Sequence, residues 1–147
     1  MELIVFSGIQ GAGKTTFYQQ RLSSSHVRLS LDMRRTRNRE GILLFACLAA
    51  QQPCVVDNTN PTAHQRARYT ALGKAAAFRT VLYFFDIDLE HAMARNAERP
   101  ESERIPEVAV RGTFAKLEKP TTLEGFDQLF YVKQSCEHGW IVEDFNP

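Results

Sequence analysis

The sequence has little of several features that would each indicate a particular class of protein. Its three cysteines include no Cys-x-x-Cys pair and show no metal-ligand spacing, so a thiolate metal site or a disulfide framework is not expected. No apolar run approaches membrane-spanning length, and no basic stretch precedes the first apolar run as it would in a signal peptide. We therefore expect a soluble, cytoplasmic protein with buried free thiols.

An excess of charge of one sign is also missing. Lysine and arginine total 18 and aspartate and glutamate total 17, which gives a formal net charge of +1. Any contact with nucleic acid must therefore come from a local basic patch. The 147 residues, 44% of them hydrophobic, are typical of a single globular domain spanning residues 1–147.

A glycine-rich segment near the N-terminus has the spacing of a P-loop. Gly8 is followed by four residues and then by Gly13-Lys14-Thr15. In such a loop, backbone N–H groups surround phosphate oxygens, the lysine reaches the outer phosphates and the threonine hydroxyl binds Mg²⁺. The segment predicts binding of ATP and Mg²⁺ through Gly8, Gly11, Ala12, Gly13, Lys14, Thr15 and Thr16.

The pattern around this loop predicts an α/β protein. Apolar strand-like runs alternate with helix-like segments, which is typical of a parallel sheet covered by helices. We expect the three-layer fold of P-loop kinases, with a sheet of about five strands and helices on both faces. The expected strands are 3–6, 27–31, 54–56, 80–85 and 129–132, with a further edge strand at 140–142, and the expected helices are 15–21, 41–51, 61–77, 88–99 and 107–118.

Carboxylates follow the predicted strands, where ligands bind in open parallel sheets. We expect Asp32, Asp57, Asp86 and Asp88 to converge near one Mg·nucleotide site. Asp57 is placed to support the metal together with Thr15. Asp32 suits a general base that accepts a proton from an attacking hydroxyl, although it could equally be a helix N-cap paired with Arg35.

Arginines form two groups. Arg34, Arg35, Arg37 and Arg39 follow Asp32, where they could bind an anionic acceptor or form a solvated face. Arg95 and Arg99 are four residues apart beside a polar segment ending at Pro106, which suggests a lid over residues 95–106. They could stabilise charge during transfer, or form an ordinary surface pair with Glu103.

With these motifs in place, the chain resembles the 5′-kinase domain of polynucleotide kinases, within the wider group of small P-loop kinases. The Asp-Asn-Thr-Asn-Pro segment and the arginine-bearing lid are more specific than the P-loop, and together they are similar to the eukaryotic DNA-repair form of this domain. The resemblance rests on residues 8–16, on 55–61 followed by Arg66-Ala67-Arg68-Tyr69, on 94–99 leading to Ile105-Pro106, and on 114–126 with Glu118, Pro120, Glu124 and Gly125.

The resemblance implies a role for each matched residue. Asp32 would be the general base on the acceptor 5′-hydroxyl, and Arg35, with Arg34 beside it, would grip the adjacent phosphate. Arg99 would be the lid arginine of the transition state, with Arg95 as its partner and Lys14 on the phosphates. Ser30-Leu31 stand where the family often has Asn-Arg, so one donor of the family is missing here.

We therefore expect an ATP-dependent kinase that acts on a polynucleotide 5′-hydroxyl end, with a separate phosphatase or ligase as a partner. Two alternatives stay open: a kinase of a nucleoside, sugar or antibiotic, and a non-catalytic ATP-binding module. Tyr18, Tyr69 and Phe114 are candidates for stacking on bases if they face the groove, although such residues more often lie in the core.

Overall fold

The computed structural model describes residues 1–30, 37–135 and 139–144. Six strands form one sheet in the order β2-β3-β1-β4-β5-β6, in which neighbours are parallel except for β6, which runs antiparallel to β5. The expected α/β architecture is confirmed, and the tail does supply an additional edge strand. The strands are β1 (Glu2–Ser7), β2 (Val27–Leu29), β3 (Cys54–Val56), β4 (Arg79–Phe85), β5 (Gln128–Ser135) and β6 (Gly139–Asp144).

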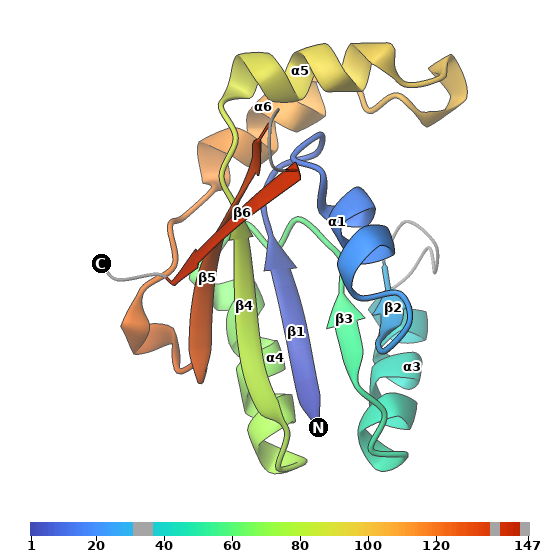
Figure 1. The fold of residues 1–147 in the computed structure, drawn as a ribbon, viewed down its shortest axis with the longest axis vertical. Helices are drawn as coiled ribbons and strands as arrows, with labels where there is room; N and C mark the ends of the chain where they lie inside the picture. Colours follow the sequence, from blue (N-terminus) through green and yellow to red (C-terminus); the bar gives the residue numbers. More distant parts are fainter. Residues whose placement is uncertain (31–36, 136–138, 145–147) are drawn as a thin grey trace.

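Helices cover both faces of the sheet (Figure 1). The helices are α1 (Lys14–Arg21), α3 (Arg37–Ala49), α4 (Ala63–Ala75), α5 (Leu89–Glu98) and α6 (Glu107–Lys116), with short 3₁₀ turns η1 (Glu101–Glu103) and η2 (Thr122–Glu124). One core cluster joins α3 and α4 to the sheet, and another joins α1 and β6 to its other face. Figure 1 shows α5 lying across the end of the sheet at which β1 and β4 finish.

The central strand β1 explains why the two layers form. Leu3 and Val5 pack on the side of α3 and α4, whereas Ile4 and Phe6 pack on the side of α1. All four side chains are fully buried. A parallel strand that is buried on both faces requires such a continuous apolar run, and this run delivers the chain directly into the glycine loop.

The cysteines that the structure describes are buried free thiols, as expected. Cys47 and Cys54 both belong to the core on the side of α3 and α4. Burial raises the pKa of Cys54 to about 12 and also raises that of Cys47, so both thiols stay protonated at neutral pH. Cys136 lies outside the described residues.

Side-chain caps fix the N-termini of α4 and α5. Thr62 caps α4 with a capping box to Gln65, and Asp88 caps α5 by accepting a hydrogen bond from the His91 backbone N–H at 2.8 Å. Hydrogen bonds from the backbone N–H and then the ring of His91 hold the pKa of Asp88 below its usual value. The expectation for α3 was less accurate, because this helix begins at Arg37 and not at Gly41, so the basic segment is partly helical.

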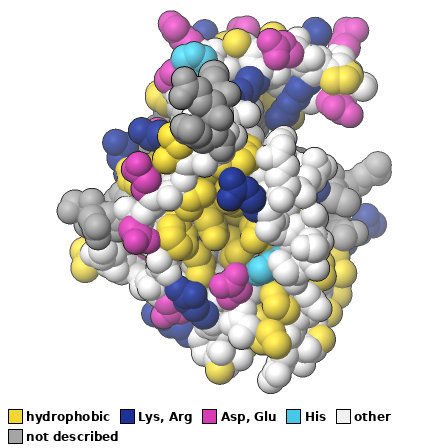
Figure 2. Space-filling view, in the orientation of Figure 1, with side chains coloured by type: hydrophobic (Ala, Val, Ile, Leu, Met, Phe, Trp, Pro, Cys, Tyr) yellow, Lys and Arg dark blue, Asp and Glu magenta, His cyan; other side chains and the backbone are white. Residues whose placement is uncertain are grey.

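Figure 2 shows how charge is distributed on one face. Hydrophobic side chains gather in the middle, and basic and acidic side chains lie next to one another around them, including over α5. This face therefore shows no continuous basic surface. Among the described residues, no helix has both the length and the apolar composition needed to cross a membrane.

A buried arginine connects several segments at the end of the sheet where the P-loop begins. Arg66 on α4 is fully buried, and its guanidinium donates two hydrogen bonds to the carboxylate of Glu124, at 2.7 and 3.0 Å. It also donates to Ser7 Oγ at the end of β1, to the Asn60 carbonyl and to the Glu118 carbonyl. Thus one side chain fixes the strand that leads into the P-loop, the segment after β3 and the segment after α6.

Replacing Arg66 should therefore be costly. We expect Arg66→Met to lower the free energy of unfolding by about 3–5 kcal/mol, because it leaves the Glu124 carboxylate buried without a counter-ion. Urea denaturation followed by circular dichroism measures this change. Arg66→Met combined with Glu124→Leu should recover part of the loss, since no buried charge then remains unpaired.

The matched control is Arg79→Met, because Arg79 is exposed at the opposite end of the sheet. This control should change the unfolding free energy by less than about 0.5 kcal/mol. If Arg66→Met lowered the free energy of unfolding as little as Arg79→Met, the buried hydrogen bonds of Arg66 would not stabilise the fold.

Candidate active site

The P-loop adopts a conformation that its glycines alone allow. Gly11 and Gly13 have φ values of 85° and 92°. A Cβ atom at position 11 would lie 2.6 Å from the Ala92 carbonyl oxygen, and one at position 13 would lie 2.7 Å from Cη2 of Trp140. Both backbone conformation and close packing therefore require glycine at these two positions.

Lys14 lies inside the curve of this loop. It is the first residue of α1, and its ammonium group donates hydrogen bonds to the carbonyls of Gly8 and Ile9, at 2.8 and 2.9 Å. The side chain is buried. A positive charge is thereby fixed at the N-terminus of a helix, where anions are favoured.

Thr15 and Asp57 meet as the sequence predicts. The Thr15 hydroxyl donates a hydrogen bond to Asp57 Oδ2 at 2.9 Å, although the two residues lie 42 positions apart. A hydroxyl and a carboxylate oxygen are ligands that suit Mg²⁺, so the pair fits this ion. Within the described ranges, no group of three or more His, Cys, Asp or Glu side chains could hold a metal, and such an ion would need further oxygens from phosphates or water.

Arg28 joins this pair, and the sequence analysis missed it. Its Nε donates to Asp57 Oδ2 at 2.7 Å, and a terminal nitrogen donates to the Thr15 hydroxyl at 3.1 Å. Arg28 lies in β2, beside Val55 of β3 in the sheet register. The available signal was a charged residue between Val27 and Leu29 in a predicted strand. Because side chains in a strand alternate between faces, Arg28 had to lie on the face opposite to its two apolar neighbours.

A cavity of about 740 Å³ opens over these groups. Arg99, the residue that follows α5, lines it opposite the P-loop, as the lid interpretation requires. Three cationic side chains, Lys14, Arg28 and Arg99, thus border one space. Its lining consists of Gln10, Gly11, Gly13, Lys14, Thr15, Thr16, Arg28, Asp57, Asn58, Thr59, Arg99, Ser102, Glu103 and Ile105.

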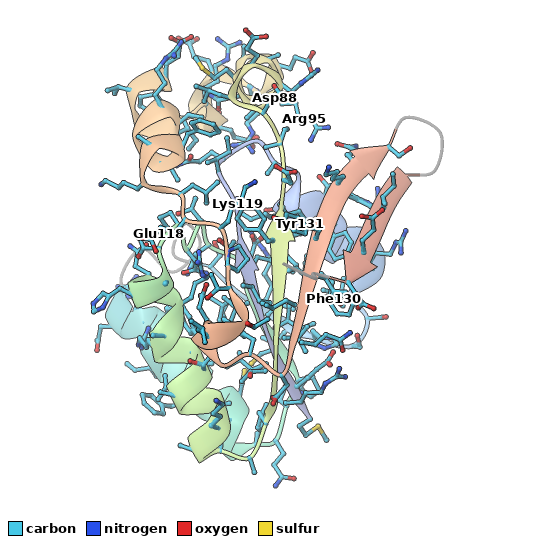
Figure 3. All side chains as sticks on the ribbon, turned by 90° about the vertical axis from the view of Figure 1, so that its left-hand side faces the viewer. Asp88, Arg95, Glu118, Lys119, Phe130 and Tyr131 are labelled. Atoms are coloured by element: carbon cyan, nitrogen blue, oxygen red, sulfur yellow. The ribbon has the colours of Figure 1, made fainter. Side chains whose placement is uncertain are left out.

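A second cavity of about 790 Å³ lies beside the P-loop, next to Ala12. Arg95 borders it and donates a hydrogen bond to the Gly11 carbonyl at 3.3 Å, so Arg95 and Arg99 line different cavities. Asp86 and Asp88 border the second cavity and Asp57 borders the first, so the acids that follow β3 and β4 line two neighbouring cavities. Figure 3 shows Asp88 and Arg95 on one side of this region and Lys119 on the other. The P-loop lies between the two cavities. It follows β1, and β3 and β4 lie on opposite sides of β1 in the sheet.

Several motif residues support the site through buried hydrogen bonds. Asn60 donates to the Phe6 carbonyl at 2.8 Å, and Asn58 donates to the buried Glu40 at 2.9 Å. The Tyr69 hydroxyl donates to the same glutamate at 2.6 Å and is fully buried, so Tyr69 cannot stack on a base. Phe114, by contrast, is exposed and borders the second cavity.

The two ends of the segment predicted as a lid are joined by hydrogen bonds from an asparagine side chain. The Asn96 side chain donates to the Ile105 carbonyl at 2.6 Å and accepts from the Ile105 N–H at 2.9 Å. This pair of hydrogen bonds fixes both ends of residues 97–104, including Arg99. Asp32, Arg34 and Arg35, the predicted base and acceptor residues, lie outside the described residues.

With this geometry established, comparison with known proteins gives a family. The AAA domain family matches residues 3–120, which is most of the chain. The chain belongs to the AAA domain family. The matched residues include the P-loop, the segment around Asp57 and the arginines after β4, and the fold is P-loop kinase-like.

A curated relative supports the resemblance seen in the sequence. The bifunctional polynucleotide phosphatase/kinase of Schizosaccharomyces pombe is 23% identical over 141 residues. The match covers 92% of this chain and 34% of that protein, so the chain spans about a third of the length of this relative.

Solved structures share the fold. Kti12 of Chaetomium thermophilum, solved in complex with ADP-AlF3, superposes with a TM-score of 0.65 at 19% identity over 92% of each chain. A gluconokinase from Sinorhizobium meliloti 1021 gives a TM-score of 0.59 at 16% identity, over 90% of this chain and 82% of that one. The PezAT toxin–antitoxin system of Streptococcus pneumoniae gives 0.67 at 14% identity, over 95% of this chain and 70% of that one.

The glycine requirement in the loop can be tested directly. We expect Gly11→Ala to lower the free energy of unfolding by about 1–3 kcal/mol, because the new methyl group meets a backbone carbonyl in a left-handed conformation. Urea denaturation provides the measurement. Gly112→Ala is the control, since a Cβ at this helical position meets nothing within 4 Å and should be neutral or slightly stabilising. Equal effects of the two substitutions would contradict the packing described here.

Proposed function

We propose that this protein is an ATP-dependent kinase that transfers the γ-phosphate to the 5′-hydroxyl end of a polynucleotide. The observation that carries the proposal is the cavity over the P-loop, where Lys14, the Thr15–Asp57 pair and Arg99 face one space. These groups come from three separate parts of the sequence. Phosphoryl transfer needs a cradle for phosphates, a metal position and a cation for the transition state, and the cavity offers all three.

The two cavities suit two parts of ATP. The P-loop cavity suits the phosphates, with Thr15 and Asp57 holding Mg²⁺. The second cavity is lined by apolar Ile87, Phe114 and Leu117 beside Arg95, and its volume lies in the range of small-molecule sites, so we assign it to the nucleoside. Bound Mg²⁺ would neutralise negative charge on the outer phosphate oxygens.

The acceptor residues of this proposal are those that the resemblance implies. Asp32 accepts the proton of the 5′-hydroxyl, and Arg35, with Arg34, holds the adjacent phosphate. Lys14 and Arg99 neutralise the charge that develops on the transferring group, and Arg95 holds the lid against the Gly11 carbonyl. In this proposal residues 1–147 are one kinase domain, residues 95–106 are its lid, and a separate cytoplasmic phosphatase or ligase completes end processing.

A small-molecule acceptor is the second candidate. The net charge of +1 and the mixed charges on the face in Figure 2 favour it, because tight binding to a long nucleic acid depends on many phosphate contacts. A nucleoside, sugar or antibiotic hydroxyl would need only the P-loop cavity and one base.

Transfer of labelled γ-phosphate from ATP distinguishes the two acceptors. We expect label on 5′-hydroxyl oligonucleotides and none on a panel of nucleosides, sugars and aminoglycosides offered in parallel. Label on a small molecule alone would reject the polynucleotide acceptor and keep the kinase. ATP binding without any transfer would support the non-catalytic alternative.

Substitutions in the machinery should separate chemistry from binding. Arg99→Ala and Lys14→Ala should each lower kcat by about 10²–10³-fold, because each removes a cation from the transferring phosphate. Asp32→Ala should abolish transfer while ATP binding, measured by calorimetry, survives. Arg111→Ala on the exposed surface of α6 is the matched control and should leave kcat unchanged. Near-normal turnover of Asp32→Ala would show that another group is the base.

Arg35 should act on the acceptor side. We expect Arg35→Ala to raise the KM for a 5′-hydroxyl oligonucleotide by about tenfold or more, because it removes a charged contact to phosphate, and to leave the KM for ATP nearly unchanged. Steady-state kinetics with each substrate varied in turn measures the two constants. An equal rise in both would mean that Arg35 only supports the structure.

A further inference from the structure

Arg28 contacts both oxygen atoms that the P-loop pattern assigns to the metal. Its Nε donates to Asp57 Oδ2 at 2.7 Å, and its terminal nitrogen donates to Thr15 Oγ1 at 3.1 Å. The Thr15 hydroxyl donates to the same Asp57 oxygen at 2.9 Å. These three side chains form a closed triangle of hydrogen bonds at the floor of the P-loop cavity.

The ion pair between Arg28 and Asp57 is largely buried, and this burial explains why Asp57 needs a cationic partner. The Asp57 side chain is 2% exposed and that of Arg28 is 19% exposed. A carboxylate removed from water to this degree is strongly disfavoured unless a cation or several donors lie beside it. Arg28 supplies both the positive charge and the donor beside the buried carboxylate of Asp57.

A divalent cation and this guanidinium would draw on the same side-chain oxygen atoms. Mg²⁺ binds its oxygen ligands at about 2.1 Å, and it would need the Asp57 oxygen and the Thr15 oxygen to which Arg28 donates. Two positive charges so close to one carboxylate also repel each other. In the described part of the chain, no group of three or more Asp, Glu, His or Cys side chains forms a metal cluster that would offset this repulsion.

We propose that Arg28 competes with the divalent cation for Asp57. The protein alone therefore binds free Mg²⁺ weakly, and the metal enters together with nucleotide phosphates, which add oxygen ligands and negative charge. Arg28 lines the same cavity as Lys14 and Arg99, so on release from Asp57 it turns to a phosphate oxygen. The role of the nucleotide rests on the function proposed above, whereas the competition for Asp57 does not.

Metal binding to the protein without nucleotide tests the competition. Mn²⁺ is titrated in place of Mg²⁺, and free Mn²⁺ is measured by electron paramagnetic resonance. We expect Arg28→Met to bind Mn²⁺ about tenfold or more tighter than the unsubstituted protein, because the competing charge is gone. The doubly substituted Arg28→Met, Asp57→Asn protein should lose this gain, which would locate the metal at Asp57.

Two further variants make the result decisive. Arg79→Met removes an arginine far from the cavity and should leave Mn²⁺ affinity unchanged. Arg28→Gln keeps a donor for Asp57 but no charge, and it should show the same gain as Arg28→Met if the latter does not fold. The proposal is overturned if the folded Arg28 variants bind Mn²⁺ no more tightly than the unsubstituted protein, or if the gain persists with Asp57→Asn.

This experiment needs neither nucleotide nor transfer. A gain in Mn²⁺ affinity together with no kinase activity would reject the proposed function and keep the role of Arg28. Kinase activity together with unchanged Mn²⁺ affinity in the Arg28 variants would reject the role of Arg28 and keep the proposed function.

Discussion

The buried ion pair between Arg66 and Glu124 is the interaction on which the site depends. The guanidinium makes five hydrogen bonds, and they reach the end of β1, the segment after β3 and both ends of the segment from Glu118 to Glu124. The P-loop begins directly after β1, and Asp57 lies directly after β3. The relative position of the P-loop and Asp57 is therefore set by a side chain that does not line the cavity.

The two cavities beside the P-loop have different linings. Charged side chains line both cavities, but the cavity on the side of β4 also includes more apolar side chains than the cavity on the side of β3. Arg95 and Arg99 belong to the same short stretch, yet they serve opposite sides of the loop. The hydrogen bonds between Asn96 and Ile105 hold the ends of the segment that contains Arg99 and begins directly after Arg95 and Asn96.

Residue patterns predicted the fold class, most elements and the meeting of Thr15 with Asp57, because β periodicity, capping residues and the P-loop spacing are local signals. The division of Asp57 from Asp86 and Asp88 between two cavities was not predicted, because strand order decides on which side of β1 a residue lies, and strand order is not a local property. Arg28 was missed for a related reason, since its partner is 29 positions away. Arg66 was quoted only as part of a family motif, and no pattern indicated that it would be buried.

The close contact between the C-terminal hairpin and the P-loop has a practical consequence. Trp140 is the only tryptophan of the chain, and its ring leaves no room for a side chain at Gly13. Its indole N–H donates to Gln20 on α1 at 2.7 Å, so the ring is held against the helix that the loop begins. The protein thus carries its own fluorophore beside the phosphate cradle, and its emission can follow events there in unlabelled protein.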